Sequence, residues 1–471
     1  MGTVRRQLGG IYIYTRTRAH VYSSTNYNTQ TDTCTGVRPH TECTRCFLLE
    51  YICVNQSIKF IYKALYYNSS CHKVDQVIRV NVESEEQIQL LRALEKDTYW
   101  GLDFWLHPVN SELPVDIHVP YQSLYAVKDY LSAHNIPYTV MITNVQDLLD
   151  EEKAEMEENN MKERHSRSFN FGAYHPLETI YSWMDDLVAA HPNLVTKDQI
   201  GTSYEGRPMY VLKFSTGGDR RPAIWVDSGI HSREWVSQAT GVWTANKIAT
   251  DFGTDPSLTS LLNTMDIYLL IVANPDGYVH THTSDRMWRK TRSQNPGSMC
   301  RGVDPNRNWD AGFGGPGASS NPCSDSYHGP SPHSEIEVKN VVNLVKSHGN
   351  FKSFISIHAY SQLLMYPYGY TCKDAYHAAE LDSVGRSAVQ KLSSLHGTTY
   401  KVGSICKIIY QASGGSIDWS YNVGIKYSFA FELRDTGRYG FILPANQIIP
   451  TASETWLALK DIMAYVRDHP Y

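Results

Sequence analysis

"AIWVDSGIHSREWVSQ", residues 223–238, passes from the pattern of a buried strand to that of a helix. The first part is a continuous apolar run around Trp225, which is typical of a strand covered on both faces. A turn follows, and Ser232 belongs to the residue types that cap helices, so one interpretation is a helix that begins there. Strand, turn and helix in succession form the unit of α/β folds. The fold class therefore depends on whether this alternation recurs.

The same alternation recurs throughout residues 168–471. The clearest strand patterns are "YVLKFST", "AIWVDSG", "IYLLIVANPDG", "SFISIHAYSQ" and "YSFAFELRD". Apolar residues at helical spacing are found at 176–190, 233–252, 334–348 and 452–466. We therefore predict an α/β fold with helices on both faces of a mostly parallel sheet. In such folds, ligands bind at the carboxyl ends of the strands.

Three of these strand patterns end in a residue that can bind a metal. "AIWVDSGIH" ends at His231, "FISIH" at His358 and "YSFAFE" at Glu432, while Glu234 lies just inside the first helix. Zinc takes nitrogen and oxygen ligands, and catalytic zinc sites use three protein ligands. The alternatives are an ordinary strand–turn–helix connection at His231 and Glu234, and a core histidine at His358. A buried carboxylate needs a partner, so we expect metal-bound water or an arginine beside Glu432.

Arginines in polar loops indicate which charged group the substrate carries. "MWRKTRS" contains Arg289, "DPNRNWD" contains Asn306 and Arg307, and Arg233 lies between His231 and Glu234. Guanidinium groups bind carboxylates through two parallel hydrogen bonds. Surface solubility or structural ion pairs would explain any single arginine. Together with candidate metal ligands at one edge of the sheet, the arginines favour a substrate with a free carboxylate.

Residues 72–167 have a different organisation. Between residues 72 and 146 the patterns run strand, helix, strand, strand, helix, strand, which predicts a small ferredoxin-like α+β domain. Residues 147–167 are rich in charge and predict an acidic helical connector. The connector ends in "ERHSR", where Arg164 and Arg167 would suit a trypsin-like protease. The segment predicts a zymogen, and an ordinary linker is the alternative.

The composition of the chain excludes some classes of function. The 471 residues are 42% hydrophobic and 19% charged with a net charge of −5, which fits a globular protein and not nucleic-acid binding. We find no apolar run of about 18 residues that would span a membrane.

Residues 1–71 show no legible signal peptide, and we expect them to be poorly ordered or wrongly joined. "CTRC" at 43–46 has the spacing of a zinc knuckle or a redox pair, but a second pair is missing.

Several longer motifs of the sequence resemble those of a known family. "GIHSREW", "NPDGY", "WRKTRS", "DPNRNW", "IYQASGGSIDW" and "FELRDTGRYGF" resemble the zinc carboxypeptidases of the pancreatic A/B type. The resemblance covers residues 72–471, including the propeptide. It implies a mixed, mostly parallel eight-stranded sheet after a ferredoxin-like propeptide domain, and a zymogen that removes the carboxy-terminal residue of peptides and proteins. A non-catalytic, peptide-binding relative is the alternative.

The resemblance also implies a role for each site residue. One Zn²⁺ is bound by three ligands: His231, Glu234 and His358. Glu432 acts as general base and acid on a zinc-activated water, and Arg289 stabilises the oxyanion. The substrate-binding residues that it implies are Arg233, Asn306, Arg307, Tyr360, Tyr410, Ile417 and Phe441.

Specificity and cellular context follow from the same resemblance. It implies disulfides Cys300–Cys323 and Cys372–Cys406, and the second pair resembles that of the second A isoform, which prefers aromatic residues. An apolar Ile417 at the pocket floor implies carboxy-terminal aromatic and branched aliphatic residues as substrates. Disulfides imply an oxidising compartment and a secreted protein. We expect a monomer that is activated by a trypsin-like protease and has no nucleic-acid or membrane partner.

Overall fold

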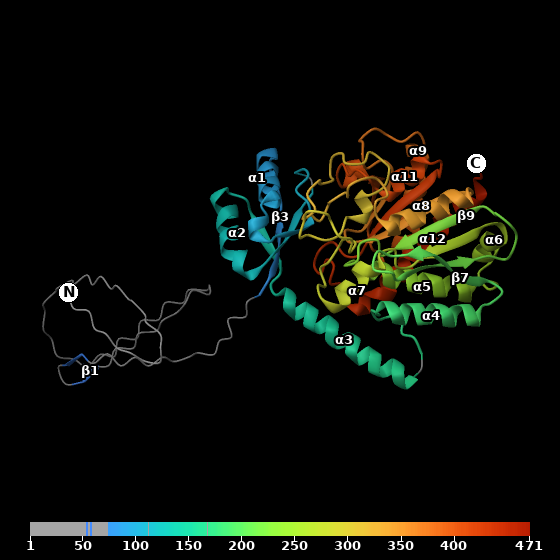
Figure 1. Ribbon diagram of the computed structural model, residues 1–471, viewed down its shortest axis with the longest axis horizontal. Coiled ribbons are helices and arrows are strands. Elements are labelled where there is room, and N and C mark those ends of the chain that lie inside the picture. The colour runs from blue at the N-terminus through green and yellow to red at the C-terminus, as the bar shows by residue number, and fades with distance from the viewer. Residues whose placement is uncertain (1–52, 55–56, 59–73, 112, 167) are drawn as a thin grey trace. The chain divides into compact units, whose positions relative to one another are not determined.

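The computed structural model in Figure 1 describes residues 53–54, 57–58, 74–111, 113–166 and 168–471. The chain divides into two units, Met1–His72 and Lys73–Tyr471. The described part of the first unit is an antiparallel pair, β1 (Cys53–Val54) and β2 (Ser57–Ile58). The "CTRC" motif, and most of the amino-terminal segment for which we expected little order, lie outside the described residues.

The second unit begins with a small four-stranded sheet. Its elements are β3 (Gln76–Val80), α1 (Glu85–Lys96), η1 (Thr98–Trp100), β4 (Asp103–Leu106), β5 (Val115–Val119), α2 (Tyr121–Ala133) and β6 (Tyr138–Ile142). The strand order is β4-β5-β3-β6, and every neighbouring pair is antiparallel. Ile78 and Ile117 on the sheet pack against Leu91 of α1 and Leu131 of α2 in one apolar cluster. The ferredoxin-like α+β domain that the sequence predicted is thus confirmed.

A long helix connects this domain to the larger sheet. Helix α3 spans Val145–Ser166, so it begins slightly before the predicted connector (Figure 1). Arg164 lies in its last turn, and Arg167 lies outside the described residues. Glu152 of α3 forms a bidentate salt bridge with Arg286. Arg286 Nε donates to Glu152 Oε1 at 2.6 Å, and Arg286 Nη2 donates to Glu152 Oε2 at 3.0 Å. Both side chains are largely buried, so the helix is tied to the larger domain near its middle.

The larger domain contains one eight-stranded sheet. Its strands are β7 (Val195–Thr202), β8 (Pro208–Phe214), β9 (Ala223–Ser228), β10 (Asp266–Leu270), β11 (Phe351–Ala359), β12 (Leu363–Tyr366), β13 (Lys401–Ser404) and β14 (Tyr427–Leu433). Their order is β13-β12-β14-β11-β9-β10-β8-β7. The central strands β10, β9, β11 and β14 are parallel, as are β12 and β13. The pairs β12–β14, β10–β8 and β7–β8 are antiparallel, so the predicted mixed, mostly parallel sheet is confirmed.

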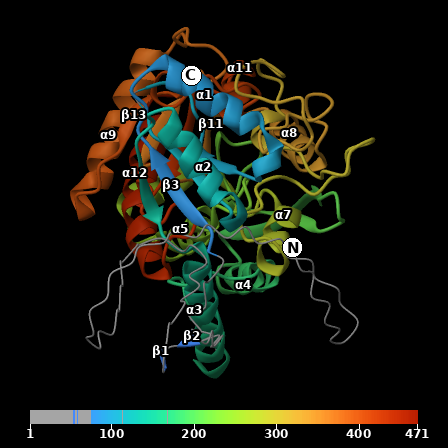
Figure 2. The ribbon, with the colours of Figure 1, turned by 90° about the vertical axis from the view of Figure 1, so that its left-hand side faces the viewer.

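Helices cover both faces of this sheet. They are α4 (Leu177–Ala190), α5 (Trp235–Asp251), α6 (Pro256–Thr264), α7 (Pro275–Thr283), η2 (Pro305–Arg307), α8 (Ile336–His348), α9 (Ala378–His396), α10 (Ile405–Ile408), α11 (Ser416–Asn422), η3 (Ala445–Gln447) and α12 (Ile448–Asp468). Successive side chains of β9 point to opposite faces. Ile224 packs in a cluster with Ile248 of α5 and Ile462 of α12, whereas Trp225 packs with Val341 of α8. Figure 2 shows α9 and α12 on one side of the sheet and α8 on the other.

The connection after β9 differs from the sequence-based interpretation. Helix α5 begins at Trp235 with Glu234 as the N-cap residue, so the interpretation of Ser232 as the cap was wrong. Ser232 instead donates its hydroxyl to the backbone oxygen of Trp288 at 2.6 Å, which leaves it unavailable to the helix. Strand β9 ends at Ser228, and His231 therefore lies in the turn, three residues beyond the strand.

Candidate functional site

The three predicted metal ligands meet at the carboxyl edge of the central strands. His231 lies in the turn after β9, and Glu234 caps α5. His358 is the penultimate residue of β11, opposite Glu432 in the parallel register with β14. Parallel strands end at one edge of a sheet, and this brings residues from distant parts of the chain together.

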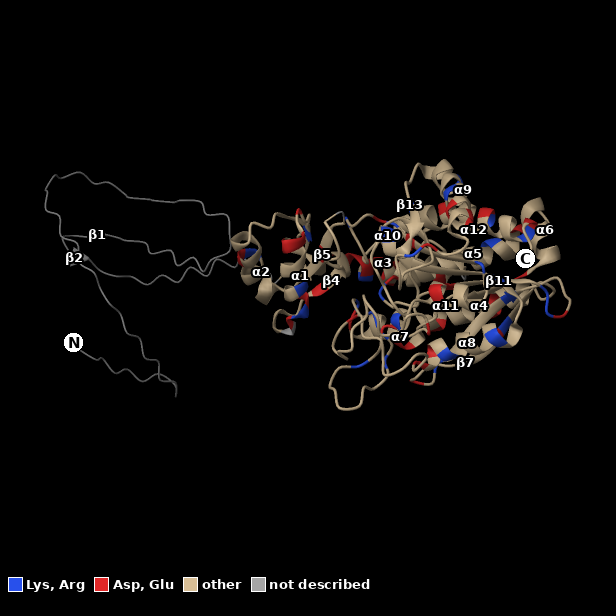
Figure 3. Ribbon diagram, turned by 90° about the horizontal axis from the view of Figure 1, so that it is seen from above, with Lys and Arg blue, Asp and Glu red and all other residues tan. Residues whose placement is uncertain are grey.

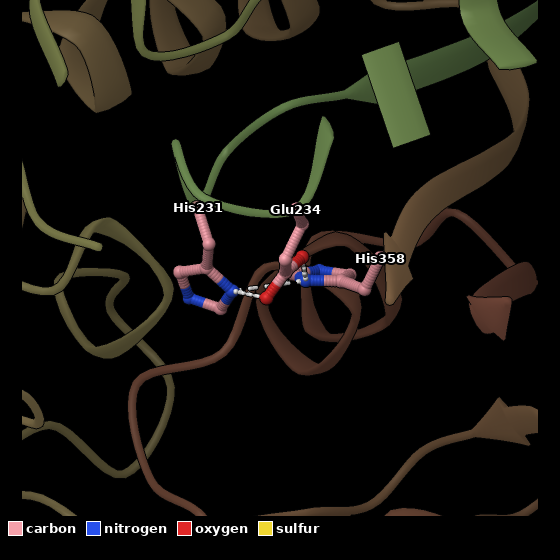
Figure 4. A group of neighbouring side chains, drawn as sticks. All are labelled: His231, Glu234 and His358. Atoms are coloured by element: carbon pink, nitrogen blue, oxygen red, sulfur yellow. Dashed lines mark hydrogen bonds and ion pairs between the residues drawn. The ribbon is translucent and has the colours of Figure 1, made fainter. Parts of the chain in front are cut away.

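The ligand atoms of His231, Glu234 and His358 converge on one point. His231 Nδ1 lies 2.8 Å from Glu234 Oε1, His358 Nδ1 lies 3.2 Å from Glu234 Oε2, and the two ring nitrogens are 3.1 Å apart. Figure 4 shows the three side chains pointing toward one another. All three are buried, and their donor atoms lie within 4.8 Å of one another. Two nitrogens and a carboxylate around one point fit the donor set of Zn²⁺.

The ring of His231 is oriented by a carboxylate on its far side. His231 Nε2 lies 3.0 Å from Asp304 Oδ1, which leaves Nδ1 as the metal-binding nitrogen. Asp304 is fully buried and also accepts from Arg289 Nη2 at 3.0 Å. Asp304 lies in the "DPNRNWD" motif, but its role was not predicted from the sequence. The available signal in the sequence was an Asp directly before Pro305, which is typical of a helix cap. In the structure Asp304 caps η2, and Asn306 N donates to its Oδ1 atom at 2.8 Å.

The electrostatics of the group suit a cation. Burial and the charge of Arg289 lower the pKa of His231 below its ordinary value, which keeps the ring neutral and its lone pair available. Burial alone would raise the pKa of Glu234, but the neighbouring imidazoles outweigh it, and the pKa falls well below its ordinary value. For His358, burial alone would lower the pKa, but the charge of Glu234 outweighs it and the pKa is raised, so the ionised carboxylate attracts positive charge to this point. A neutral imidazole and an ionised carboxylate are the forms that bind zinc, so zinc would displace a proton from the His358 ring.

Glu432 lies beside this group with a carboxyl oxygen that lacks a partner. Its Oε2 atom is buried and has no hydrogen-bond partner among the described residues. Burial raises the pKa of Glu432 to about 8, an effect that the charge of His358 partly offsets. A carboxyl group whose proton affinity is raised in this way is suited to accept and return a proton near neutral pH.

One cavity of about 410 Å³ contains the remaining predicted site residues except Arg233. It is lined by the metal-binding group, Glu432 and these predicted residues: Arg289, Asn306, Arg307, Tyr360, Tyr410, Ile417 and Phe441. Arg307 Nη2 donates to Tyr410 Oη at 2.8 Å, and Asn306 Oδ1 accepts from Ser416 N at 2.9 Å. Apolar side chains form another part of the lining, including Ile417, Met365 and Ala430. The cavity thus combines fixed cations with an apolar region.

The small amino-terminal domain lies against the same cavity. Arg233, which we predicted to bind substrate, pairs with Asp103 of β4, with Nη1 and Oδ2 2.8 Å apart. Tyr360 donates to Asp116 Oδ2 of β5 at 2.7 Å. The ring of Trp105 lies 5.1 Å from that of Phe441. In this form of the chain, Arg233, Tyr360 and Phe441 are therefore occupied by the small domain.

The structure also bears on the predicted disulfides, the charge distribution and the absence of membrane-spanning helices. The disulfides Cys300–Cys323 and Cys372–Cys406 are both formed. Lys and Arg are interspersed with Asp and Glu along the described ribbon (Figure 3). The helices in the described part of the chain are too short or too polar to span a membrane.

Family models match two parts of the chain. Residues 180–458 match the zinc carboxypeptidase family, and residues 78–152 match the carboxypeptidase activation peptide. The chain is 64% identical to carboxypeptidase A2 of Mus musculus over 397 residues, which is 84% of this chain and 95% of the relative. It is 61% identical to carboxypeptidase A1 of Sus scrofa over 396 residues, which is 84% of this chain and 94% of the relative.

Solved structures agree with the sequence relatives. The crystal structure of thrombin activatable fibrinolysis inhibitor superposes with a TM-score of 0.78 at 37% identity, covering 84% of this chain and all of that chain (100%). Carboxypeptidase A from Helicoverpa armigera superposes with a TM-score of 0.76 at 29% identity, covering 84% of this chain and 98% of that one. With its converging His–Glu–His group and its activation peptide, the chain belongs to the zinc carboxypeptidase family, as an A-type hydrolase of the zymogen kind.

Proposed function

We propose that the cavity of about 410 Å³ is the active site, in which the predicted residues carry out exopeptidase chemistry. The observation that carries this proposal is the presence, in one cavity, of a zinc-type donor group, a carboxyl oxygen of Glu432 that has no partner in the described part of the chain, and the paired Arg307 and Tyr410. The comparisons give no support for a non-catalytic relative.

His231, Glu234 and His358 would hold the zinc ion. When bound, the ion supplies Lewis acidity, which polarises a carbonyl group and acidifies water. Glu432 takes the proton of the attacking water and returns it to the leaving amine nitrogen. Arg289 is held beside the donor group by Asp304 and donates to the oxygen on which negative charge develops.

The position of the cut follows from the carboxylate site. Arg307 offers a guanidinium fork to the terminal carboxylate, with Asn306 and Tyr410 beside it. Holding that carboxylate places the last peptide bond at the metal-binding group, so a single residue is released. A positioned carboxylate therefore makes the enzyme an exopeptidase.

We assign the pocket for the released side chain to Ile417, Met365 and Ala430. Ile417 is 2% exposed and lines the cavity together with the other two residues. Burying an aromatic or branched aliphatic side chain there stabilises the complex by about 1.5 to 3 kcal/mol, whereas an unpaired Lys or Arg charge would cost several kcal/mol. We expect release of carboxy-terminal Phe, Tyr, Trp and Leu.

The specificity assignment is tested by Ile417→Asp, after activation of both proteins. The new carboxylate can pair with a basic side chain, so the ratio of kcat/KM for peptides ending in Arg and in Phe should rise by at least about tenfold. Zinc content and circular dichroism show whether the variant remains folded and loaded. An unchanged ratio in a folded, zinc-loaded variant would place the pocket floor elsewhere.

The domain organisation that we propose is that of a secreted zymogen. Residues 1–71 remain unassigned, 72–146 form the activation domain, 147–167 form the connector and 168–471 form the catalytic domain. The contacts of Asp103 and Asp116 with Arg233 and Tyr360 would block the approach of peptide substrates. A trypsin-like protease would remove this block by cutting after Arg164 or Arg167, and the active product would be a monomer.

Limited trypsin treatment tests the activation scheme. We expect the full chain to be largely inactive on protein-sized substrates, and activity to appear together with a new amino terminus after residue 164 or 167. Size-exclusion chromatography with light scattering gives the oligomeric state of the product. A full chain that cleaves proteins before and after treatment at the same rate would contradict the scheme.

A further inference from the structure

A buried serine and aspartate connect a metal-binding histidine to the interior of the sheet. Ser356 Oγ on β11 lies 3.2 Å from His358 Nε2, two residues further along the same strand. The same hydroxyl donates to Asp227 Oδ1 on β9 at 2.6 Å, and the parallel register places these two residues opposite each other. Trp225 Nε1 donates to Asp227 Oδ2 at 2.7 Å. All four side chains are buried, so the contacts are protected from water.

The position of the ring proton gives this contact a direction. His358 directs Nδ1 toward Glu234, so in a neutral, metal-binding ring the proton must be on Nε2. Asn306 cannot accept that proton. Its Oδ1 atom accepts from Ser416 N, so the amide turns its nitrogen, which is only a donor, toward Nε2 at 3.5 Å. Ser356 Oγ can accept from Nε2 and still donate its own proton to Asp227.

We propose that Asp227 and Ser356 are positioning residues for zinc. Through Ser356, the Asp227 carboxylate holds the His358 ring in the tautomer and orientation that direct Nδ1 at the metal. Asp304 performs the same task for His231 by direct contact at 3.0 Å, so the two ligand histidines are supported in different ways. Such outer partners change metal affinity by about 10- to 100-fold. The proposal rests on the assignment of His358 as a zinc ligand.

The zinc dissociation constant of the full chain, measured by competition with a chelator, is the primary test. Ser356→Ala should weaken zinc binding by about 10-fold or more. The matched control is Ser353→Ala, since Ser353 lies on the same strand, is equally buried and donates to the backbone oxygen of Tyr427 at 2.8 Å. It removes a buried hydroxyl without touching the histidine, so zinc affinity should stay at the wild-type value. Equal affinities of the wild type and of folded Ser356→Ala would overturn the proposal.

Asp227→Asn provides a second, independent variant. Asparagine offers one acceptor oxygen to two donors, the Trp225 indole and the Ser356 hydroxyl, so the connection to His358 is weakened. We expect about 10-fold weaker zinc binding in the Asp227→Asn variant and little further loss when the change is added to Ser356→Ala. Additive losses in this double-mutant cycle would show that Asp227 acts by another route, and would overturn its role. If Ser356→Ala does not fold, an unchanged zinc affinity of Asp227→Asn overturns the proposal alone.

Two further measurements separate positioning from general stability. The melting temperature of each metal-free variant reports structural damage, and we expect similar losses for Ser356→Ala and Ser353→Ala. The visible absorption spectrum of the Co²⁺-loaded protein reports ligand geometry, and it should change in Ser356→Ala and remain the same in Ser353→Ala. A wild-type chain that binds no zinc would refute the proposed function as well, whereas normal binding in all variants refutes only this inference.

Discussion

Two glutamates of the larger domain, Glu432 and Glu454, differ in whether their carboxyl oxygens have hydrogen-bond partners. Glu454 on α12 is fully buried and accepts from Arg434 Nε at 2.7 Å, from Arg434 Nη2 at 2.5 Å and from Thr398 Oγ1 at 2.7 Å. Glu432, two residues before Arg434, has an oxygen with no hydrogen-bond partner among the described residues. A buried carboxylate that is fully paired supports the fold, whereas one left unpaired at a cavity is available for chemistry.

The largest effect is expected at the unpaired group. Glu432→Gln removes the proton acceptor, so kcat of the activated enzyme should fall by about 100-fold or more. Zinc content should stay the same, because Glu432 is not one of the three converging ligands. The free energy of unfolding should not fall, since the buried Oε2 atom has no hydrogen bond to lose within the described residues. Near-normal turnover in a zinc-loaded variant would remove Glu432 from the mechanism.

At the paired group, the expected effect is on stability. Glu454→Gln removes the buried charge of a partly exposed ion pair and leaves the Arg434 guanidinium without its counterion, which should lower the free energy of unfolding by about 3 kcal/mol. The kcat per folded molecule should stay at the wild-type value. Urea unfolding and kcat, measured for Glu432→Gln and Glu454→Gln in parallel, should give opposite patterns. A large loss of kcat in folded Glu454→Gln would erase the distinction between the two groups.

A third glutamate, Glu337, sharpens the comparison, because only one of its carboxyl oxygens has a hydrogen-bond partner among the described residues and it lies outside the cavity lining. Glu337 of α8 accepts from Tyr204 N at 2.9 Å through Oε1, while its buried Oε2 has no hydrogen-bond partner among the described residues. Burial raises the pKa of Glu337 from its ordinary value of 4.5 to about 7. Between these two pH values the native state keeps a proton that the unfolded state has lost, so stability falls as the pH rises through this window.

Glu337→Gln should therefore remove part of the pH dependence of stability. Relative to the variant, the wild type should lose about 2 to 3 kcal/mol of unfolding free energy as the pH rises from about 4.5 to 7, and the loss should persist above pH 7. Urea unfolding at several pH values measures this difference, and kcat should be unaffected. Parallel pH curves for the two proteins would mean that Glu337 is ionised in the native state like an exposed glutamate.

The fold and the ligand set could be predicted from the sequence because their signals are local. Apolar runs such as "AIWVD" and helical spacing of apolar residues reflect burial of individual strands and helices, and these recur along the chain in the order that an α/β fold requires. His231, His358 and Glu432 could be singled out because each follows or ends a buried run. The long motifs then related these positions to a known family. Even the beginning of α5 was misjudged, however, because Ser232 hydrogen-bonds to Trp288, a residue distant in the sequence.

Only the tertiary structure showed which groups support or cover the site. Asp304 orients His231 across 73 positions of sequence, and Ser356 and Asp227 meet across 129. Asp103 reaches Arg233 and Asp116 reaches Tyr360 from a separate domain. Such pairs depend on strand register and on the packing of one domain against another, and no local pattern of residues encodes either. The sequence by itself therefore determined the elements and the chemistry available to them, and the tertiary structure decided which buried charges are paired and which remain free to act.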